Sequence, residues 1–267
     1  MALDRADDLA LLVAAAESAG PIAMGYFRGD FETWDKPGEG PVTEADLAVD
    51  AMLRAELGAA RPDYGWLSEE SEGEPDRAGR ERVFIVDPID GTRAFIAGHE
   101  GWGIALAVAE RGRVVAAAMH LPACGETFAA ALGQGATCNS APIRASGRGM
   151  LEGAAALVTV TQLKDELWPG GPPPVKRHFR PSLAWRLCLV GQGRFDLMVT
   201  LRPAYEWDIA AGSLIATEAG AVVTDGAGAA LAFNRHPARA PGVIAAPPAL
   251  HRALMARREP LPPRGGG

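Results

Sequence analysis

The spacing of hydrophobic and polar positions changes near residue 147 and divides the chain into two parts. In the first part, apolar residues at helical spacing predict helices over 4–28, with Gly20-Pro21 as a candidate kink, and over 43–60. Short apolar runs bounded by Gly, Pro or charged residues predict strands over 64–67, 83–86, 104–109, 114–120 and 126–130. The last three strands are expected to pair antiparallel, because only short turn-like segments separate them.

After residue 147, strand-like and helical patterns alternate. Strands are predicted over 156–161, 195–200, 221–224 and 243–246. Helices are predicted over 162–168, 182–190, 208–219 and 248–258. We therefore expect an α/β (α+β) chain with an antiparallel α+β lobe over 1–147, an α/β lobe over 148–260 and a disordered tail over 261–267.

Composition narrows the classes of function. The 267 residues are 48% hydrophobic and 22% charged, as in ordinary globular proteins. The net charge of -7 argues against nucleic-acid binding, which requires a basic surface, but leaves a small anionic substrate open. Three cysteines without a C-x-x-C pair and five scattered histidines indicate neither a disulfide framework nor a zinc site. The apolar run from Leu9 to Ala16 is short, so we expect no signal peptide, no membrane span and a cytoplasmic location.

The segment Asp87-Pro-Ile-Asp-Gly-Thr92 is the strongest candidate for chemistry. A buried strand should not end in two carboxylates unless they have partners. Pro88 stiffens the segment, Gly91 lets a ligand approach the backbone closely, and Thr92 begins a helical turn whose free amides suit a phosphate. The alternative is an Asx-type turn capped by Thr92. The spacing excludes an EF-hand loop, a P-loop and a haloacid-dehalogenase-like pair of aspartates.

Three further acidic segments lie at predicted strand ends or helix starts, namely Thr43-x-x-Asp46, Glu69-Glu70 and Trp207-Asp208. Each has a structural alternative. Thr43 and Asp46 have the spacing of a capping box, Glu69-Glu70 suits a solvated loop, and Asp208 suits an N-cap. If the four segments converge, their negative charges repel, and Mg²⁺ is the expected occupant because it prefers oxygen ligands.

Together these segments resemble the inositol monophosphatase family of the fructose-bisphosphatase-like superfamily. The matching residues are Val42-Thr43-x-x-Asp46, Glu69-Glu70-Ser71, Val86-Asp87-Pro-Ile-Asp-Gly-Thr92, and Trp207-Asp208-x-Ala-x-Gly212 followed by Glu218-Ala-Gly220. The resemblance implies a layered α/β/α/β/α sandwich. It also implies a phosphomonoesterase that uses two or three Mg²⁺ ions to activate water on a small phosphate ester, without a covalent phosphoenzyme, and that forms a homodimer and is inhibited by lithium.

The resemblance also assigns roles to residues of this chain. One metal is assigned to Glu69, Asp87 and the carbonyl oxygen of Ile89, and a second metal to Asp87, Asp90 and Asp208. Thr92, assisted by Asp46 or Glu69, is implied to position the attacking water. The amides of Gly91 and Thr92 are implied to bind phosphate oxygens.

The identity of the phosphate ester rests on other positions. In inositol phosphatases an acidic residue seven positions before the last metal aspartate faces the inositol, but Leu201 stands here, beside Arg202. The stretch from Arg202 to Gly212 is more similar to bacterial 3'(2'),5'-bisphosphate nucleotidases, in which a Lys occupies the position of Arg186. We therefore expect Arg186 and Arg202 to favour a second phosphate on the substrate. The alternative for Arg186 is a surface cation. The run Arg93–Gly98 is instead closer to histidinol-phosphatase-like members.

These resemblances rank the candidate functions. A 3'(2'),5'-bisphosphate nucleotidase, converting adenosine 3',5'-bisphosphate to AMP, ranks first, inositol-1-monophosphatase second and histidinol-phosphatase third. An inactive metal-binding or regulatory member of the family is the alternative of a different class.

Overall fold

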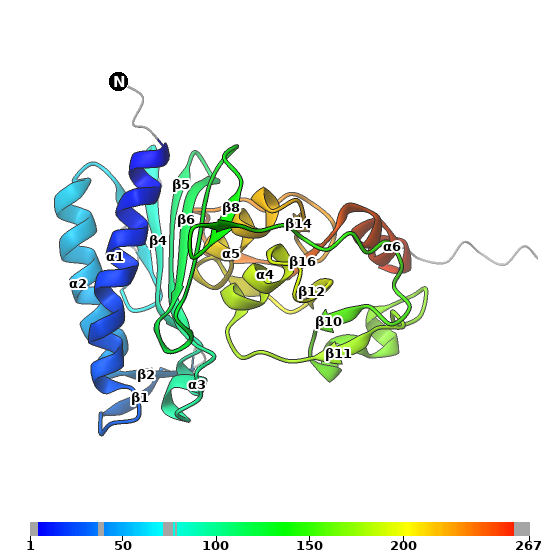
Figure 1. The fold of residues 1–267 in the computed structure, drawn as a ribbon, viewed down its shortest axis with the longest axis horizontal. Helices are drawn as coiled ribbons and strands as arrows, with labels where there is room; N and C mark the ends of the chain where they lie inside the picture. The colour runs from blue at the N-terminus through cyan, green and yellow to red at the C-terminus, as the bar shows by residue number, and fades with distance from the viewer. Residues whose placement is uncertain (1–4, 37–39, 72–76, 78, 259–267) are drawn as a thin grey trace, which may run out of the picture.

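The computed structural model describes residues 5–36, 40–71, 77 and 79–258. The elements stack in five layers that follow one another across Figure 1. The layers are helices α1 (Arg5–Tyr26) and α2 (Glu44–Ala60), a seven-stranded sheet, helices α4 (Leu183–Gly191) and α5 (Glu206–Glu218), a five-stranded sheet, and helix α6 (Pro248–Arg258). This is the α/β/α/β/α sandwich that the resemblance implies. The tail predicted over 261–267 lies outside the described residues.

The seven-stranded sheet lies between the layer of α1 and α2 and the layer of α4 and α5. Its order is β3 (Gly65–Ser68), β4 (Arg82–Asp90), β5 (Gly103–Glu110), β6 (Arg113–Leu121), β7 (Glu126–Ala131), β8 (Ala136–Cys138) and β9 (Ala141–Pro142). β3 and β4 pair parallel, and the other neighbours pair antiparallel. β4 is buried on both faces, because Phe84 and Val86 pack with α1 and α2 while Val83 and Ile85 pack with α4 and α5. Burial on both faces explains the unbroken apolar run in its sequence.

The five-stranded sheet is mixed. Its order is β11 (Lys176–His178), β10 (Ala155–Leu157), β12 (Leu197–Thr200), β16 (Val243–Ala246) and β14 (Val222–Thr224). Two small antiparallel ladders join β1 (Thr33–Lys36) to β2 (Gly40–Thr43) and β13 (Ala204–Tyr205) to β15 (Arg239–Ala240). The remaining short elements are helix α3 (Thr92–Ile96) and the 3₁₀ turns Pro122–Cys124, Val160–Leu163 and Asp165–Leu167.

Helices α4 and α5 pack closely in the middle layer because Gly212 lies between them. A Cβ atom on Gly212 would lie 2.6 Å from the Cβ of Leu187 and 2.7 Å from the carbonyl oxygen of Ala184. Real Cβ atoms do not approach other atoms so closely. A larger residue at position 212 would therefore push α4 away from α5. The contact fixes the N-terminus of α4 beside the N-terminus of α5, where Asp208 lies.

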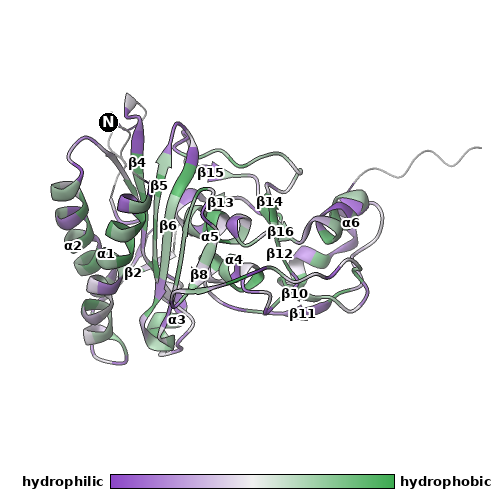
Figure 2. Ribbon diagram, turned by 45° about the horizontal axis from the view of Figure 1, so that its top comes forward, coloured by the Kyte–Doolittle hydropathy of each residue, from purple (hydrophilic) through white to green (hydrophobic). Residues whose placement is uncertain are grey.

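Helix α1 covers the outer face of the seven-stranded sheet. By length and composition alone it is also apolar enough to cross a membrane. In the structure Leu12, Ala16 and Ala19 are fully buried in the cluster that α1 forms with α2 and the sheet. Figure 2 shows the hydrophobic strand β6 between α1 on one side and α5 on the other.

Most of the predicted elements are confirmed, with differences at their ends. The helix predicted over 208–219 begins at Glu206, so Tyr205 is its N-cap and the N-cap alternative for Asp208 is wrong. The strand predicted over 156–161 is only Ala155–Leu157, and the helix predicted over 162–168 consists of 3₁₀ turns. Strands of two to four residues, such as β8, β9, β11, β13 and β15, were missed. Such strands are too short to show a periodicity of two.

The tight contact at Gly212 predicts a stability difference between two Gly→Ala substitutions. We expect Gly212→Ala to lower the free energy of unfolding by about 1–3 kcal/mol, because the added methyl group overpacks the α4–α5 contact. The control is Gly58→Ala in α2, where nothing lies within 4 Å of the added Cβ. This change should raise the free energy of unfolding by roughly 0.5–1 kcal/mol, because Ala favours a helix. Urea denaturation measures both, and equal effects would contradict the close contact.

Candidate active site

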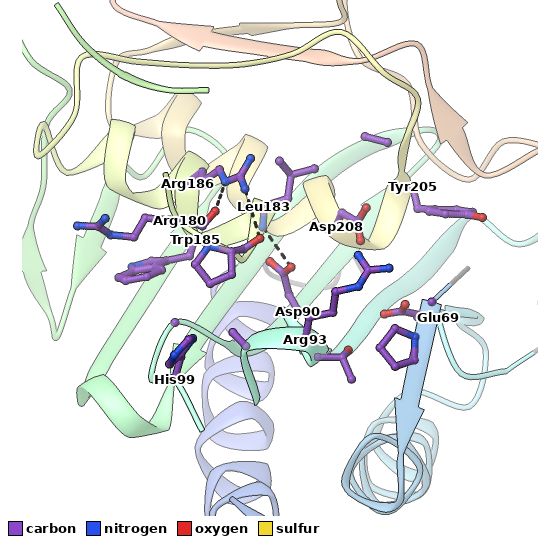
Figure 3. Close-up of a pocket in the computed structure, with 18 of the residues that line it drawn as sticks. Glu69, Asp90, Arg93, His99, Arg180, Leu183, Trp185, Arg186, Tyr205 and Asp208 are labelled. Atoms are coloured by element: carbon purple, nitrogen blue, oxygen red, sulfur yellow. Dashed lines mark hydrogen bonds between the residues drawn. The ribbon is translucent and has the colours of Figure 1, made fainter. Parts of the chain in front are cut away.

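Three of the four predicted acidic segments line one open cleft of about 1520 Å³. Glu69 follows β3, Asp90 ends β4, and Asp208 lies in the first turn of α5. Figure 3 shows these three carboxylates directed toward the same space from three different elements. Thr92 and Gly91 line the same cleft. The fold therefore brings together the end of β4 and segments that lie far apart in the sequence.

The end of β4 is shaped by Pro88 and Gly91. The register with β5 shifts between Asp87 and Asp90, where Pro88 has no N–H to donate to the ladder. Inside this irregularity the N–H of Ile89 donates to the Asp87 carboxylate at 3.1 Å. Gly91 adopts φ +103°, and a Cβ there would lie 3.1 Å from the carbonyl oxygen of Gly101. Glycine is therefore needed for both its conformation and its space.

Asp87, Asp90 and Asp208 form the compact centre of the site. Each offers one carboxylate oxygen within 4.8 Å of the others. Asp87 and Asp90 are buried, whereas Asp208 is partly exposed to the cleft. These are the three residues assigned to the second metal, and the fold places them together.

Asp90 is held by the N-terminus of α4. Its carboxylate accepts hydrogen bonds from the Ser182 hydroxyl at 2.5 Å, the Leu183 N–H at 3.1 Å and the Ala184 N–H at 2.7 Å. Ser182 also caps α4 by accepting a hydrogen bond from the N–H of Trp185 at 2.9 Å. Sequence reasoning did not assign Ser182 a role at the site. Serine at the start of a helix is a sequence signal for a cap, but which carboxylate it meets depends on the tertiary structure.

Asp46 connects the start of α2 to Thr92. One of its oxygens accepts hydrogen bonds from the Thr43 N–H at 2.8 Å and the Thr43 hydroxyl at 2.5 Å, within the predicted capping box. Its other oxygen lies 3.3 Å from the Thr92 hydroxyl, which also lies 3.1 Å from the carbonyl oxygen of Ile89. The capping box is confirmed, and it also holds the buried Asp46 beside Thr92, which lines the cleft.

Glu69 and Glu70 are held against the cleft by Lys36, which sequence reasoning missed. The Nζ of Lys36 donates to the carbonyl oxygen of Glu69 at 3.1 Å and forms an ion pair with the Glu70 carboxylate. Ser68 donates a hydrogen bond to the buried Asp50. The solvated-loop alternative for Glu69-Glu70 is therefore wrong. A single Lys in a four-residue strand carries no local signal of this contact.

Burial raises the pKa of each acidic group in the cluster, and repulsion between carboxylates adds to the rise for Asp87, Glu69 and Asp208. Burial is the main cause for Asp87 and Glu69, whose pKa values rise well above the ordinary ones, and neighbouring carboxylates add to it. Burial, then Asp90, raises the pKa of Asp208 from 3.8 to about 7. The pKa of Asp90 and of Asp46 also rises through burial, although their hydrogen bonds oppose the rise.

The donor set suits Mg²⁺. The cluster presents carboxylate oxygens, and hard oxygen ligands are those that Mg²⁺ prefers. A divalent cation would also offset the repulsion that raises these pKa values, because it favours the ionised carboxylates. The residues present therefore fit a magnesium site.

The two predicted substrate-binding arginines differ in their surroundings. Arg186 is buried, and its Nε donates to the carbonyl oxygen of Arg180 at 2.5 Å while its guanidinium lies 4.7 Å from the Phe179 ring centroid. Burial lowers its pKa to about 10, and the nearby Asp90 opposes this change. The surface-cation alternative for Arg186 is thus wrong, because its side chain anchors the loop before α4. Arg202 is exposed on the cleft wall, where its charge lowers the pKa of Asp208.

The raised pKa of Asp208 predicts how stability depends on pH. In the unfolded chain Asp208 ionises near 3.8, but in the folded, metal-free protein it stays protonated up to about 7. The protonated Asp208 therefore stabilises the fold fully below pH 3.8, and this stabilisation is lost as the pH rises from there to about 7. We expect the Tm in EDTA to fall between about pH 4 and pH 7, and Asp208→Asn to flatten the curve. Differential scanning calorimetry tests this, and an unchanged slope in the variant would contradict it.

Comparison with known proteins agrees with this site. A model of the inositol monophosphatase family matches residues 4–261. A histidinol-phosphatase of Chlorobaculum parvum is 34% identical over 226 residues, covering 82% of this chain and 85% of that protein. A fructose-1,6-bisphosphatase/inositol-1-monophosphatase of Thermotoga maritima is 37% identical over 204 residues, covering 73% and 75%. The solved structure of a T. maritima IMPase has a TM-score of 0.81 and 29% identity, covering 94% of this chain and 96% of that one. Family, fold and acidic cluster agree, and the chain belongs to the inositol monophosphatase family, whose members are magnesium-dependent phosphatases.

Proposed function

We propose that this phosphatase hydrolyses a small phosphate monoester with Mg²⁺, and that the ester is histidinol phosphate. The observation that carries the reaction type is the convergence of Asp87, Asp90 and Asp208 within 4.8 Å beside Gly91 and Thr92. When bound by this cluster with Glu69 and the Ile89 carbonyl, Mg²⁺ would neutralise phosphate charge and lower the pKa of water.

Thr92 and Asp46 are placed to orient the attacking water. When the Thr92 hydroxyl donates its hydrogen bond to Asp46, 3.3 Å away, its oxygen is left to accept a hydrogen bond from water. The two hydrogen bonds from Thr43 keep the Asp46 carboxylate in this position. The raised pKa of Asp46 makes its carboxylate a stronger proton acceptor, which suits a general base.

The amides at the start of α3 are placed to bind the phosphate. The first helical hydrogen bonds of α3 are donated by Ala94 and Phe95 to the carbonyl oxygen of Gly91. The amides before them, at Gly91 and Thr92, precede the helical ladder at the wall of the cleft. N–H groups in this position favour anionic oxygens.

Two observations favour histidinol phosphate. The histidinol-phosphatase of C. parvum shares 34% identity over most of both chains, and the run Arg93–Gly98 resembles members of that type. The exposed carboxylate of Asp35 also lines the cleft, where it can meet the ammonium group of this substrate. Leu201 in place of an acidic residue disfavours inositol phosphate.

A 3'(2'),5'-bisphosphate nucleotide, which ranked first on the sequence alone, is now the second candidate, because the similar proteins carry the names of histidinol-phosphatases and inositol monophosphatases. The exposed Arg202 on the cleft wall favours it, because a second phosphate needs a cation that is not already engaged in the fold. Arg186 supports it less, since its Nε and Nη2 donate to the backbone of Arg180 and Pro181. Homodimer formation, lithium inhibition, a cytoplasmic location and the absence of membrane or nucleic-acid partners stay predictions.

The central position of Asp87 predicts the effect of Asp87→Asn. We expect this change to lower kcat/KM at least about a hundredfold, because Asp87 is assigned to both metals. The metal-free variant should be as stable as the wild type or more stable, because one repelling carboxylate is gone. Phosphate release with added Mg²⁺ and the Tm in EDTA measure the two effects. Turnover like that of the wild type in this variant would refute the role of Asp87.

Arg202 predicts a difference between substrates. We expect the wild type to prefer histidinol phosphate over adenosine 3',5'-bisphosphate and inositol 1-phosphate. A charge-assisted contact contributes about 1.5–3 kcal/mol, so Arg202→Ala should lower kcat/KM for the bisphosphate roughly tenfold to a hundredfold and for histidinol phosphate much less. Arg113→Ala, an exposed arginine at the start of β6, is the matched control. A wild type that prefers the bisphosphate would reverse our ranking, and one that hydrolyses none of the three would favour a regulatory member of the family.

A further inference from the structure

Glu206, Asn234 and Arg77 form a hydrogen-bonded chain that links the start of α5 to the segment after β3. Glu206 is 1% exposed and Arg77 is 8% exposed. The three residues come from parts of the sequence that are up to 157 positions apart. Such a buried polar chain is costly unless each member has its partners, so its contacts matter individually.

The Glu206 carboxylate binds two backbone amides of a distant loop. It accepts hydrogen bonds from the N–H of Asn234 at 2.6 Å and from the N–H of Arg235 at 2.9 Å. The N–H of Glu206 itself donates to the carbonyl oxygen of Ala238 at 3.0 Å. Although Glu206 is the first residue of α5, its side chain is therefore used to fasten the helix to the 234–238 loop rather than to cap its own helix.

Arg77 fastens the same loop to the N-terminal half of the chain. Its guanidinium donates to the Asn234 side-chain oxygen at 2.5 Å and to the carbonyl oxygen of Arg235 at 2.8 Å. The Asn234 side-chain amide donates back to the carbonyl oxygen of Arg77 at 3.1 Å. The Cα of Arg77 lies 3.2 Å from where a Cβ of Gly65 would be, so Arg77 packs directly against the first residue of β3.

The two ends of this hydrogen-bonded network adjoin two elements that carry or directly precede predicted metal ligands, α5 at its first turn and β3 at its first residue, Gly65. Asp208 lies two residues after Glu206 in the first turn of α5, and Glu69 follows directly after β3. We propose that Glu206, Asn234 and Arg77 are positioning residues that set the separation between Asp208 and Glu69 and thereby the affinity for Mg²⁺. This inference rests on the proposed function, because it requires the acidic cluster to bind the metal.

A second buried carboxylate network, around Asp8, serves as a control because it should not influence Mg²⁺ affinity. Asp8 is also a fully buried carboxylate, and it accepts hydrogen bonds from Arg61 at 3.0 Å, from Arg82 at 2.7 Å and from Tyr64. It joins α1 to the end of α2 and the start of β4, and it does not line the cleft. Loss of Asp8 should therefore cost stability without moving a metal ligand.

The test compares Mg²⁺ binding in three variants. Glu206→Gln keeps the size of the side chain but sets an amide NH₂ against one of the two N–H donors. Asn234→Gly keeps the backbone N–H and suits the φ of +60° at this position, while it removes only the side-chain contacts with Arg77. Asp8→Asn is the control. Isothermal titration calorimetry with MgCl₂ and no substrate measures the Kd, and phosphate release at increasing Mg²⁺ separates the metal requirement from kcat.

We expect Glu206→Gln and Asn234→Gly to weaken Mg²⁺ binding about tenfold, the size of effect seen when partners of metal ligands are changed. Saturating Mg²⁺ should restore most of kcat, whereas Asp8→Asn should lower Tm and leave the Kd for Mg²⁺ unchanged. Unchanged Mg²⁺ binding in Asn234→Gly would overturn the inference, and so would an equal loss in Asp8→Asn. If Glu206→Gln does not fold, Asn234→Gly alone decides. A wild type that binds no Mg²⁺ would instead contradict the proposed function itself.

Discussion

The structure depends on holding several carboxylates together where little water reaches them. Burial and mutual repulsion both oppose ionisation there, as the raised pKa values of Asp87, Glu69 and Asp208 record. The fold offsets part of this cost with the N-termini of three helices. Asp46 lies in the first turn of α2, Asp208 in the first turn of α5, and the first amides of α4 donate to Asp90. The positive ends of helix dipoles favour negative charge, and a bound cation can offset the remainder.

The layered architecture brings these helix ends to one place. β4 is buried on both faces because it lies between the α1–α2 layer and the α4–α5 layer. Gly212 must lack a side chain for α4 to approach α5. The network of Glu206, Asn234 and Arg77 then ties α5 to the segment that follows β3. Close packing in the core and polar contacts at the loops therefore serve the same purpose, which is to fix the distances between carboxylates.

The fold fixes the side chains of one half of the cleft more firmly than those of the other half. The half that we propose meets the phosphate is built from backbone amides, buried carboxylates and capped helix ends, whose positions follow from the fold. The half that we propose meets the rest of the substrate is built from exposed side chains such as Arg202 and Asp35. The chemistry is accordingly common to the family, while the substrate depends on a few residues of the cleft wall.

The sequence by itself determined the family, the order of most helices and strands, and the identity of the clustered acidic residues. It did so because Asp87-Pro-Ile-Asp-Gly-Thr92 and Trp207-Asp208 are local patterns whose residue types are dictated by backbone geometry and ligand chemistry. Only the tertiary structure decided that Ser182 holds Asp90, that Lys36 holds Glu70, and that Arg186 anchors a loop. These contacts join residues separated by 92, 34 and 6 positions. A side chain's partner across such a fold is set by the packing of whole layers, which leaves no periodic or local mark in the sequence.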